Sequence, residues 1–160
     1  MYAFFIVHVA SRRVVYAAAT RKPTQAWTAQ QLRNATMAAD APAILVRDRD
    51  EKFGAEFDRV AEGAGARVIK TAVRAPNMNA VAERFVGSVR REVLNHVLLL
   101  GAEHLDALVR EYRTYFNESR PHQALEQRTP FGGPDRPDVT RPITRRPVLG
   151  GLHVDYRRAA

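Results

Sequence analysis

Two apolar runs at the start of the chain restrict its fold more than any other feature. Tyr2–Val9 is almost continuously apolar, Val14–Ala19 is a second run of Val, Ala and Tyr, and only four residues separate them. Runs of this length joined by a short turn predict a β-hairpin of buried strands over residues 2–19. Buried strands need other elements to cover them, so we expect helices against this hairpin.

The chain from the hairpin to residue 130 predicts strands that alternate with helices. Thr24 has the residue type and position of an N-cap, and Gly65 ends an apolar stripe as a helix stop. The expected elements are a helix at 24–37, a strand at 43–46, a helix at 53–64, a strand at 66–71 and helices at 80–97 and 103–117. This order predicts an α/β fold whose mixed sheet starts antiparallel and carries helices on its faces.

The last part of the chain has a different composition. Five prolines follow Thr129, and apolar periodicity is weak there. We therefore expect residues 1–130 to form the folded domain and residues 131–160 to be an irregular, basic tail rich in Pro and Gly.

The net charge points to a polyanionic partner. Lys and Arg number 25 against 17 Asp and Glu, which gives a formal charge of +8, and 22 of the 25 basic residues are Arg. Arg binds phosphate bidentately, so a nucleic acid is a plausible partner. The alternative is an Arg bias inherited from a GC-rich genome, and composition alone leaves both open.

Composition also excludes several classes of protein. The chain has no cysteine, which removes disulfides, thiolate zinc sites, iron–sulfur clusters and cysteine nucleophiles. It has no apolar run of 18 residues and no basic segment ahead of its first apolar run. We expect no membrane association and a cytoplasmic protein.

Asp48 and Asp50 follow the short strand at 43–46. Ligands and reacting groups gather at the carboxyl ends of strands in open α/β sheets, so Asp48 is placed to hold a metal ion. The alternative is a turn, with Asp50 as the cap of a helix that starts near Glu51. We assign Asp50 to the cap and leave both interpretations open for Asp48.

Glu83 lies in the first turn of the helix at 80–97, at the edge of its buried stripe. Gly87 follows one turn later, where a glycine costs about 1 kcal/mol relative to Ala, and it is favoured if another group approaches that face closely. The alternative for Glu83 is a carboxylate that complements the helix dipole. The 34 residues between Asp48 and Glu83 carry no weight by themselves, because acidic pairs are common in this chain.

Four segments occur in a recognisable order: Arg47–Phe53, Pro76–Phe85, Tyr115–Leu125 and Thr129–Pro130. Together they resemble the integrase catalytic core of bacterial insertion-sequence transposases and retroviral integrases, over about residues 2–130. The segment Pro76–Phe85, which runs from asparagines to Glu83, and the segment with Asn117, Arg120, Pro121 and His122 are specific for this family when they occur together. The C-terminal segment Leu149–Ala160 also resembles one branch of these transposases.

The resemblance implies an RNase H-like fold, a five-stranded mixed sheet flanked by helices. It also implies a site of two Asp and one Glu, in which Asp48 matches the second Asp and Glu83 matches the Glu. The first Asp lies on a central first strand that precedes the segment resembling Tyr2–Val9, so no residue here is assigned to it. We expect that Met1 is not the functional beginning of the ancestral protein and that this chain alone is a poor catalyst. Asp50 also departs from the family, where many relatives have Gly.

The resemblance further implies cutting and joining of DNA with Mg²⁺ or Mn²⁺. A two-metal site activates the attacking oxygen and stabilises the leaving oxygen, and Asp48 and Glu83 would each hold one ion. It implies DNA as partner, a homo-oligomer in the active assembly and a bacterial, nucleoid-associated location. The other functions left open are a non-catalytic DNA-binding or assembly subunit and a decayed transposase remnant.

Three arginines and two histidines complete the candidate residues. Arg84, Arg90 and Arg91 share the helix of Glu83, and Arg90, two turns on, is the first choice for a DNA phosphate contact, with a solvated face as the alternative. His8 is expected to pack in its strand, and His122 to order the loop after the last helix. No histidine pair has the spacing of metal ligands.

Overall fold

The computed structural model describes residues 1–39, 41–72, 79–132 and 139–158 of the chain. The expected loop at 75–79 therefore falls largely outside the described residues, as do Pro76–Met78 of the family-like segment. The elements are β1 (Tyr2–Val7), β2 (Val14–Thr20), α1 (Gln25–Ala38), β3 (Ile44–Arg47), α2 (Ala55–Gly63), β4 (Arg67–Lys70), α3 (Ala80–Val89), the π-helix η2 (Arg90–Leu94), α4 (Ala102–Glu118), the 3₁₀ turns η3 (Gln123–Leu125) and η4 (Leu149–Gly151), β5 (Ile143–Val148) and β6 (His153–Arg158).

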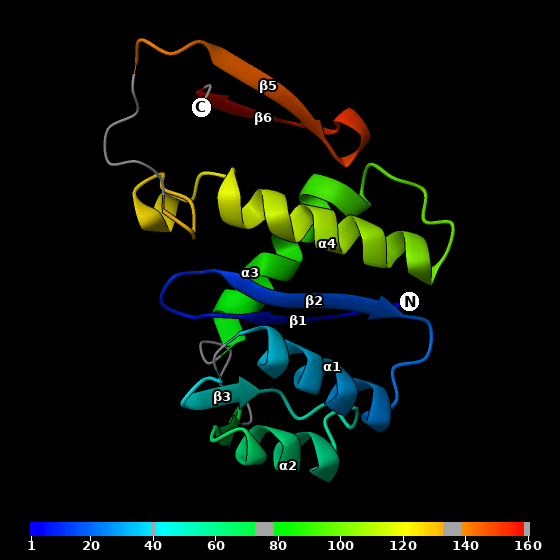
Figure 1. Cartoon of the computed structure of the whole chain (residues 1–160). Helices are drawn as coiled ribbons and strands as arrows, with labels where there is room; N and C mark the ends of the chain where they lie inside the picture. The colour runs from blue at the N-terminus through cyan, green and yellow to red at the C-terminus, as the bar shows by residue number, and fades with distance from the viewer. Residues whose placement is uncertain (40, 73–78, 133–138, 159–160) are drawn as a thin grey trace.

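The β1–β2 hairpin lies in the middle of the molecule, as Figure 1 shows, with α4 on one side of it and α1, β3 and α2 on the other. Successive side chains of a strand point to opposite faces, so an unbroken apolar strand can serve two cores. Ala3, Phe5 and Val7 pack into a first core with α3 and α4, whereas Tyr2, Phe4 and Ile6 pack into a second core with α1, α2, β3 and β4. The predicted hairpin is confirmed, and its lack of polar alternation follows from burial of both faces.

The N-terminal signals of the two following helices had different outcomes. Thr24 caps α1 as predicted, because its Oγ1 accepts a hydrogen bond of 3.1 Å from the Trp27 N–H. The prediction that Asp50 caps a helix near Glu51 was wrong: α2 begins at Ala55 after Gly54. Asp50 instead forms a turn, in which its carboxylate accepts hydrogen bonds from the backbone N–H and the ammonium group of Lys52.

The strands form separate pairs rather than one sheet. β1 and β2 are antiparallel and β3 and β4 are parallel, which confirms the orientations expected for a mixed α/β fold. No strand among the described residues joins β1 to β3, which is where the resemblance places the central first strand that has no counterpart assigned in this chain. Ile44 and Val46 of β3 are correspondingly exposed, by 49% and 36%.

The C-terminal segment contains regular structure, so the prediction of an irregular tail was wrong for residues 143–158. β5 and β6 form an antiparallel hairpin that lies beyond α4 in Figure 1. Gly150 and Gly151 take positive φ values of 65° and 96° in its turn, a conformation that favours glycine. Val148 and Leu149 are buried in the first core, which fixes the hairpin against α4.

The helix that carries Glu83 is shorter than expected. It ends at Leu94 instead of Val97, and its last turn is a π-helix in which the Asn95 N–H donates to the Arg90 carbonyl. In the parts of the chain that the structure describes, no helix is long and apolar enough to span a membrane.

A buried amide joins α4 to the hairpin. The Asn117 side chain is 2% exposed; its Oδ1 accepts from the Val14 N–H and its Nδ2 donates to the Val14 carbonyl, each at 2.9 Å. Val14 begins β2 and is itself buried, so water cannot easily replace these two hydrogen bonds.

We predict that Asn117→Ala lowers the free energy of unfolding by about 1–3 kcal/mol, because it leaves both Val14 backbone groups buried without partners. Asn34→Ala is the matched control, since it removes only an exposed hydrogen bond between Asn34 and Gln30. Urea titration of both variants measures the difference, and equal midpoints would contradict the prediction.

Candidate functional site

Asp48 stands at the carboxyl end of the parallel pair β3–β4. Arg47 is opposite Lys70 in the register, and the pairing continues where the Thr71 N–H donates to the Arg47 carbonyl at 2.9 Å. The Arg49 Nε donates to the Thr71 carbonyl at 2.9 Å and ties the two chain exits together. The chain that leaves β4 toward Glu83 therefore starts beside Asp48.

A buried ion pair fixes the main chain at Asp48. The Arg47 guanidinium binds both carboxylate oxygens of Asp58 on α2, at 2.7 and 2.8 Å, and its Nη1 donates to the Asp48 carbonyl at 2.9 Å. The hydrogen bond from Arg47 is the main reason that the pKa of Asp58 lies below its ordinary value. Asp48 thus has a fixed backbone and an exposed side chain. Neither Arg47 nor Asp58 carried a signal that would select it from the sequence.

Only one of the two oxygens of the Asp48 carboxylate takes part in the turn. Its Oδ1 accepts a hydrogen bond of 2.9 Å from the Asp50 N–H, which is the turn interpretation. Its second oxygen has no partner among the described residues, so the turn and a metal-ligand role are compatible. Burial, followed by the charges of Asp50 and Asp48, raises the pKa of Tyr2 to about 12, so the start of β1 lies close to these carboxylates.

Glu83 lies in the first turn of α3 with an exposed side chain. Carboxylate oxygens are the ligands that Mg²⁺ prefers, so the chemistry of Asp48 and Glu83 fits this ion. The described residues contain no group of three His, Cys, Asp or Glu side chains able to hold a metal ion. The assignment of Asp48 and Glu83 to one site stays a prediction.

The group that approaches Gly87 comes from the helix itself. A Cβ at Gly87 would lie 3.0 Å from the Nη1 of Arg91, one turn later in the chain. The glycine therefore leaves room for the Arg91 guanidinium to fold back along α3.

The three candidate DNA-binding arginines divide between two faces of α3. At about 100° per residue, Arg90 lies within about 20° of Glu83. Arg84 and Arg91 are exposed and line an open cavity of about 630 Å³ between α3, the β1–β2 turn and the segment after α4. Neither Asp48 nor Glu83 lines this cavity.

The two candidate histidines also differ in outcome. The prediction that His8 packs in its strand was wrong: β1 ends at Val7, and the exposed His8 ring forms a 2.7 Å hydrogen bond with Ser11 in the turn. His122 is buried after α4, where its Nε2 donates to the Phe116 carbonyl at 3.0 Å. It orders this loop as expected, and burial lowers its pKa.

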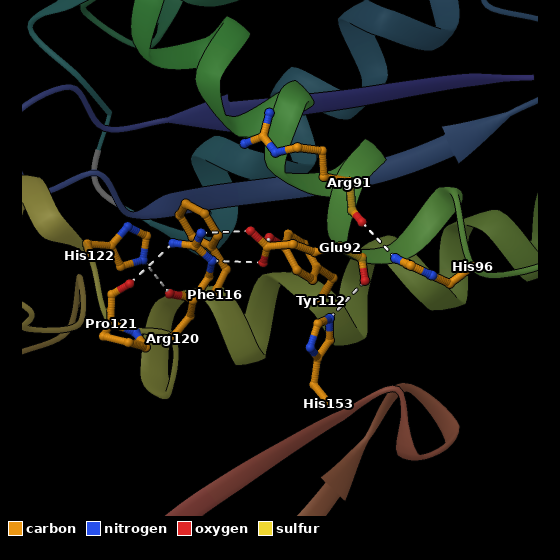
Figure 2. A network of polar contacts seen from close by, with 9 residues as sticks. All are labelled: Arg91, Glu92, His96, Tyr112, Phe116, Arg120, Pro121, His122 and His153. Carbon is orange, nitrogen blue, oxygen red and sulfur yellow. Dashed lines mark hydrogen bonds and ion pairs between the residues drawn. The ribbon is translucent and has the colours of Figure 1, made fainter.

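Figure 2 shows a polar network centred on Glu92 of η2. The Arg120 guanidinium binds both Glu92 carboxylate oxygens, at 2.7 and 2.8 Å, and the Tyr112 hydroxyl donates to the same carboxylate at 2.8 Å. The His153 Nε2 donates to the Glu92 carbonyl at 2.8 Å, which adds the C-terminal hairpin to the network. This network joins η2, α4 and β6.

Comparisons with known proteins give a family match and a fold match. Residues 64–130 match the protein family described as integrase core domain, which confirms the resemblance over that range. No curated protein matches the chain.

Among solved structures, the chain is similar to one in the cryoEM structure of the simian T-cell lymphotropic virus intasome in complex with PP2A regulatory subunit B56 gamma. The match has a TM-score of 0.66 and 14% sequence identity, and it covers 98% of this chain. It shows a shared mixed α/β fold. The chain spans 60% of the length of that protein chain.

We predict that Glu92→Gln lowers stability by about 1–3 kcal/mol at pH 7, since it weakens charge-assisted hydrogen bonds. Burial alone would raise the pKa of Glu92, but hydrogen bonds from Arg120 and Tyr112 outweigh it and hold the pKa below 4.5. A carboxylate with a lowered folded-state pKa contributes stability above its unfolded value, and this is lost as pH falls through the folded value.

The wild-type chain should therefore lose stability below about pH 4.5 more steeply than Glu92→Gln does. Glu118→Gln is the control, because its pair with Arg157 is exposed and should contribute less than about 1 kcal/mol. Thermal unfolding of the three proteins across pH 3–7 measures both effects. Parallel pH curves for wild type and Glu92→Gln would contradict this origin of the acid sensitivity.

Proposed function

We propose that this chain is the core of an enzyme for DNA integration or transposition, in which Asp48 and Glu83 hold divalent metal ions. The observation that carries the proposal is the position of Asp48 at the shared edge of β3 and β4, from which the chain leads to Glu83. The match of residues 64–130 to the integrase core domain and the fold similarity support it.

The residues would act through position and charge. The Arg47–Asp58 pair and the 3-residue turn after β3 hold Asp48 in place before any ligand binds. Bound Mg²⁺ or Mn²⁺ ions would supply the charge that activates the attacking oxygen and stabilises the leaving oxygen at phosphorus. Arg90, on the Glu83 face of α3, would contact a DNA phosphate beside the reacting one.

A second function is a non-catalytic DNA-binding or assembly subunit. It is favoured by the absence of a group of three metal-ligating side chains in the described parts of the chain. Strand transfer with Mg²⁺ by the purified chain, abolished by Glu83→Gln, would decide for the enzyme. DNA binding without strand transfer would decide for the subunit.

We predict that Fe²⁺, used in place of Mg²⁺ with ascorbate and peroxide, cleaves the chain near both Asp48 and Glu83. If the two carboxylates share a site, Asp48→Asn and Glu83→Gln should each reduce both cuts at least about tenfold. Mass spectrometry of the fragments measures the position and yield of each cut.

Glu103→Gln is the matched control, because Glu103 is an exposed carboxylate in the first turn of another helix, α4. Its cleavage pattern should equal that of the wild type. Loss of only the local cut in each variant would show two separate sites and would overturn the assignment.

A further inference from the structure

The cavity beside α3 is lined by four arginines from distant parts of the chain. Arg12 comes from the β1–β2 turn, Arg84 and Arg91 come from α3 and η2, and Arg120 follows α4. Its lining residues include no Asp or Glu. An open cavity with this balance of charge attracts an anion.

Arg12 supplies the most direct observation. Its Nε is buried and has no hydrogen-bond partner among the residues that the structure describes. Buried donors are nearly always paired, and an unpaired charged donor is costly. Arg12 also has a positive φ of 63°, a conformation that non-glycine residues rarely take. The turn therefore holds the Arg12 side chain at the wall of the cavity.

Arg84 and Arg91 have guanidinium groups without carboxylate partners in the described residues, so they are available to the same ligand. Arg120 is not available, because its three nitrogens donate to Glu92 and to the Pro121 carbonyl. Figure 2 shows this pair beside His122. Arg120 lines the cavity as part of this pair, and Arg12, Arg84 and Arg91 have no carboxylate partner among the described residues.

The size and walls of the cavity indicate more than a simple ion. Its volume of about 630 Å³ lies in the range of pockets for organic ligands. Val7, Val81 and Phe85 line it beside the charges. A phosphate attached to an apolar or weakly polar group, such as the sugar of a nucleotide, fits three arginines next to an apolar wall.

We propose that this cavity binds a backbone phosphate of a nucleic-acid strand through Arg12, Arg84 and Arg91, separately from Asp48 and Glu83. The centre of the cavity face lies about 130° around α3 from Glu83, so the two sites use different sides of one helix. The proposal rests on the proposed function only for the source of the phosphate, a DNA strand.

The first test is NMR of the arginine Nε–H groups in the full 160-residue chain. Arg12→Lys assigns the Arg12 signal and keeps its charge. A single-stranded oligonucleotide should shift the Arg12 Nε–H signal, and inorganic phosphate at the same concentration should shift it less. No shift with the oligonucleotide, or an equal shift with inorganic phosphate alone, would overturn the nucleic-acid assignment.

The second test compares variants of equal charge by fluorescence anisotropy with a labelled oligonucleotide. Arg84→Gln/Arg91→Gln should weaken binding about tenfold or more and lower the salt slope by about two. The control, Arg59→Gln/Arg67→Gln, removes the same charge from exposed positions on α2 and β4 and should weaken binding much less. Equal losses in both double variants would overturn the proposal.

The two proposals can fail separately. Arg84 and Arg91 are exposed, so their double variant should fold even if a substitution at Arg12 does not. If oligonucleotide binding depends on Arg84 and Arg91 but iron cleavage is unchanged by substitution of Asp48 or Glu83, the cavity proposal stands and the proposed enzyme function is overturned. If iron cleavage depends on Asp48 and Glu83 but the cavity variants bind the oligonucleotide as the wild type does, the enzyme proposal stands and the cavity proposal is overturned.

Discussion

Burial of the β1–β2 hairpin on both faces is the constraint on which the rest of the structure depends. Phe4 packs in the core with α1 and α2, while its neighbour Phe5 lies 4.9 Å, between ring centroids, from Phe85 of α3 in the other core. The hairpin therefore separates the two cores and contributes to both. The helix of Glu83 packs in the core on one face of the hairpin, and the strand before Asp48 packs in the core on the other face.

The sequence segment that most resembles the integrase core near residues 117–122 has structural duties. Asn117 binds the Val14 backbone, Arg120 binds Glu92, and the His122 ring packs edge-on against Phe116 at 4.3 Å while its Nε2 binds the Phe116 carbonyl. The first two contacts fix the end of α4 to β2 and η2, and the third folds the following loop back onto α4. Arg120 and His122 line the cavity, whereas Asn117 does not.

Local signals predicted the elements, whereas long-range pairing required the structure. The Thr24 cap, the Gly65 stop and the apolar hairpin depend on neighbouring residues, and the sequence was sufficient for them. The cap at Asp50 failed because Lys52 competes for its carboxylate, and the C-terminal hairpin was hidden by Pro147 within its exposed strand β5. The sequence could not single out Arg12, because most of the other residues that line its cavity come from α3 and from the segment after α4, which are distant along the chain.

The positive φ of Arg12 gives this turn an energetic cost. A left-handed backbone conformation costs a non-glycine residue about 1–2 kcal/mol, and glycine would avoid that cost. A sequence optimised only for stability would carry glycine at position 12. An arginine at position 12 therefore places a guanidinium at the wall of the cavity at the cost of local backbone strain.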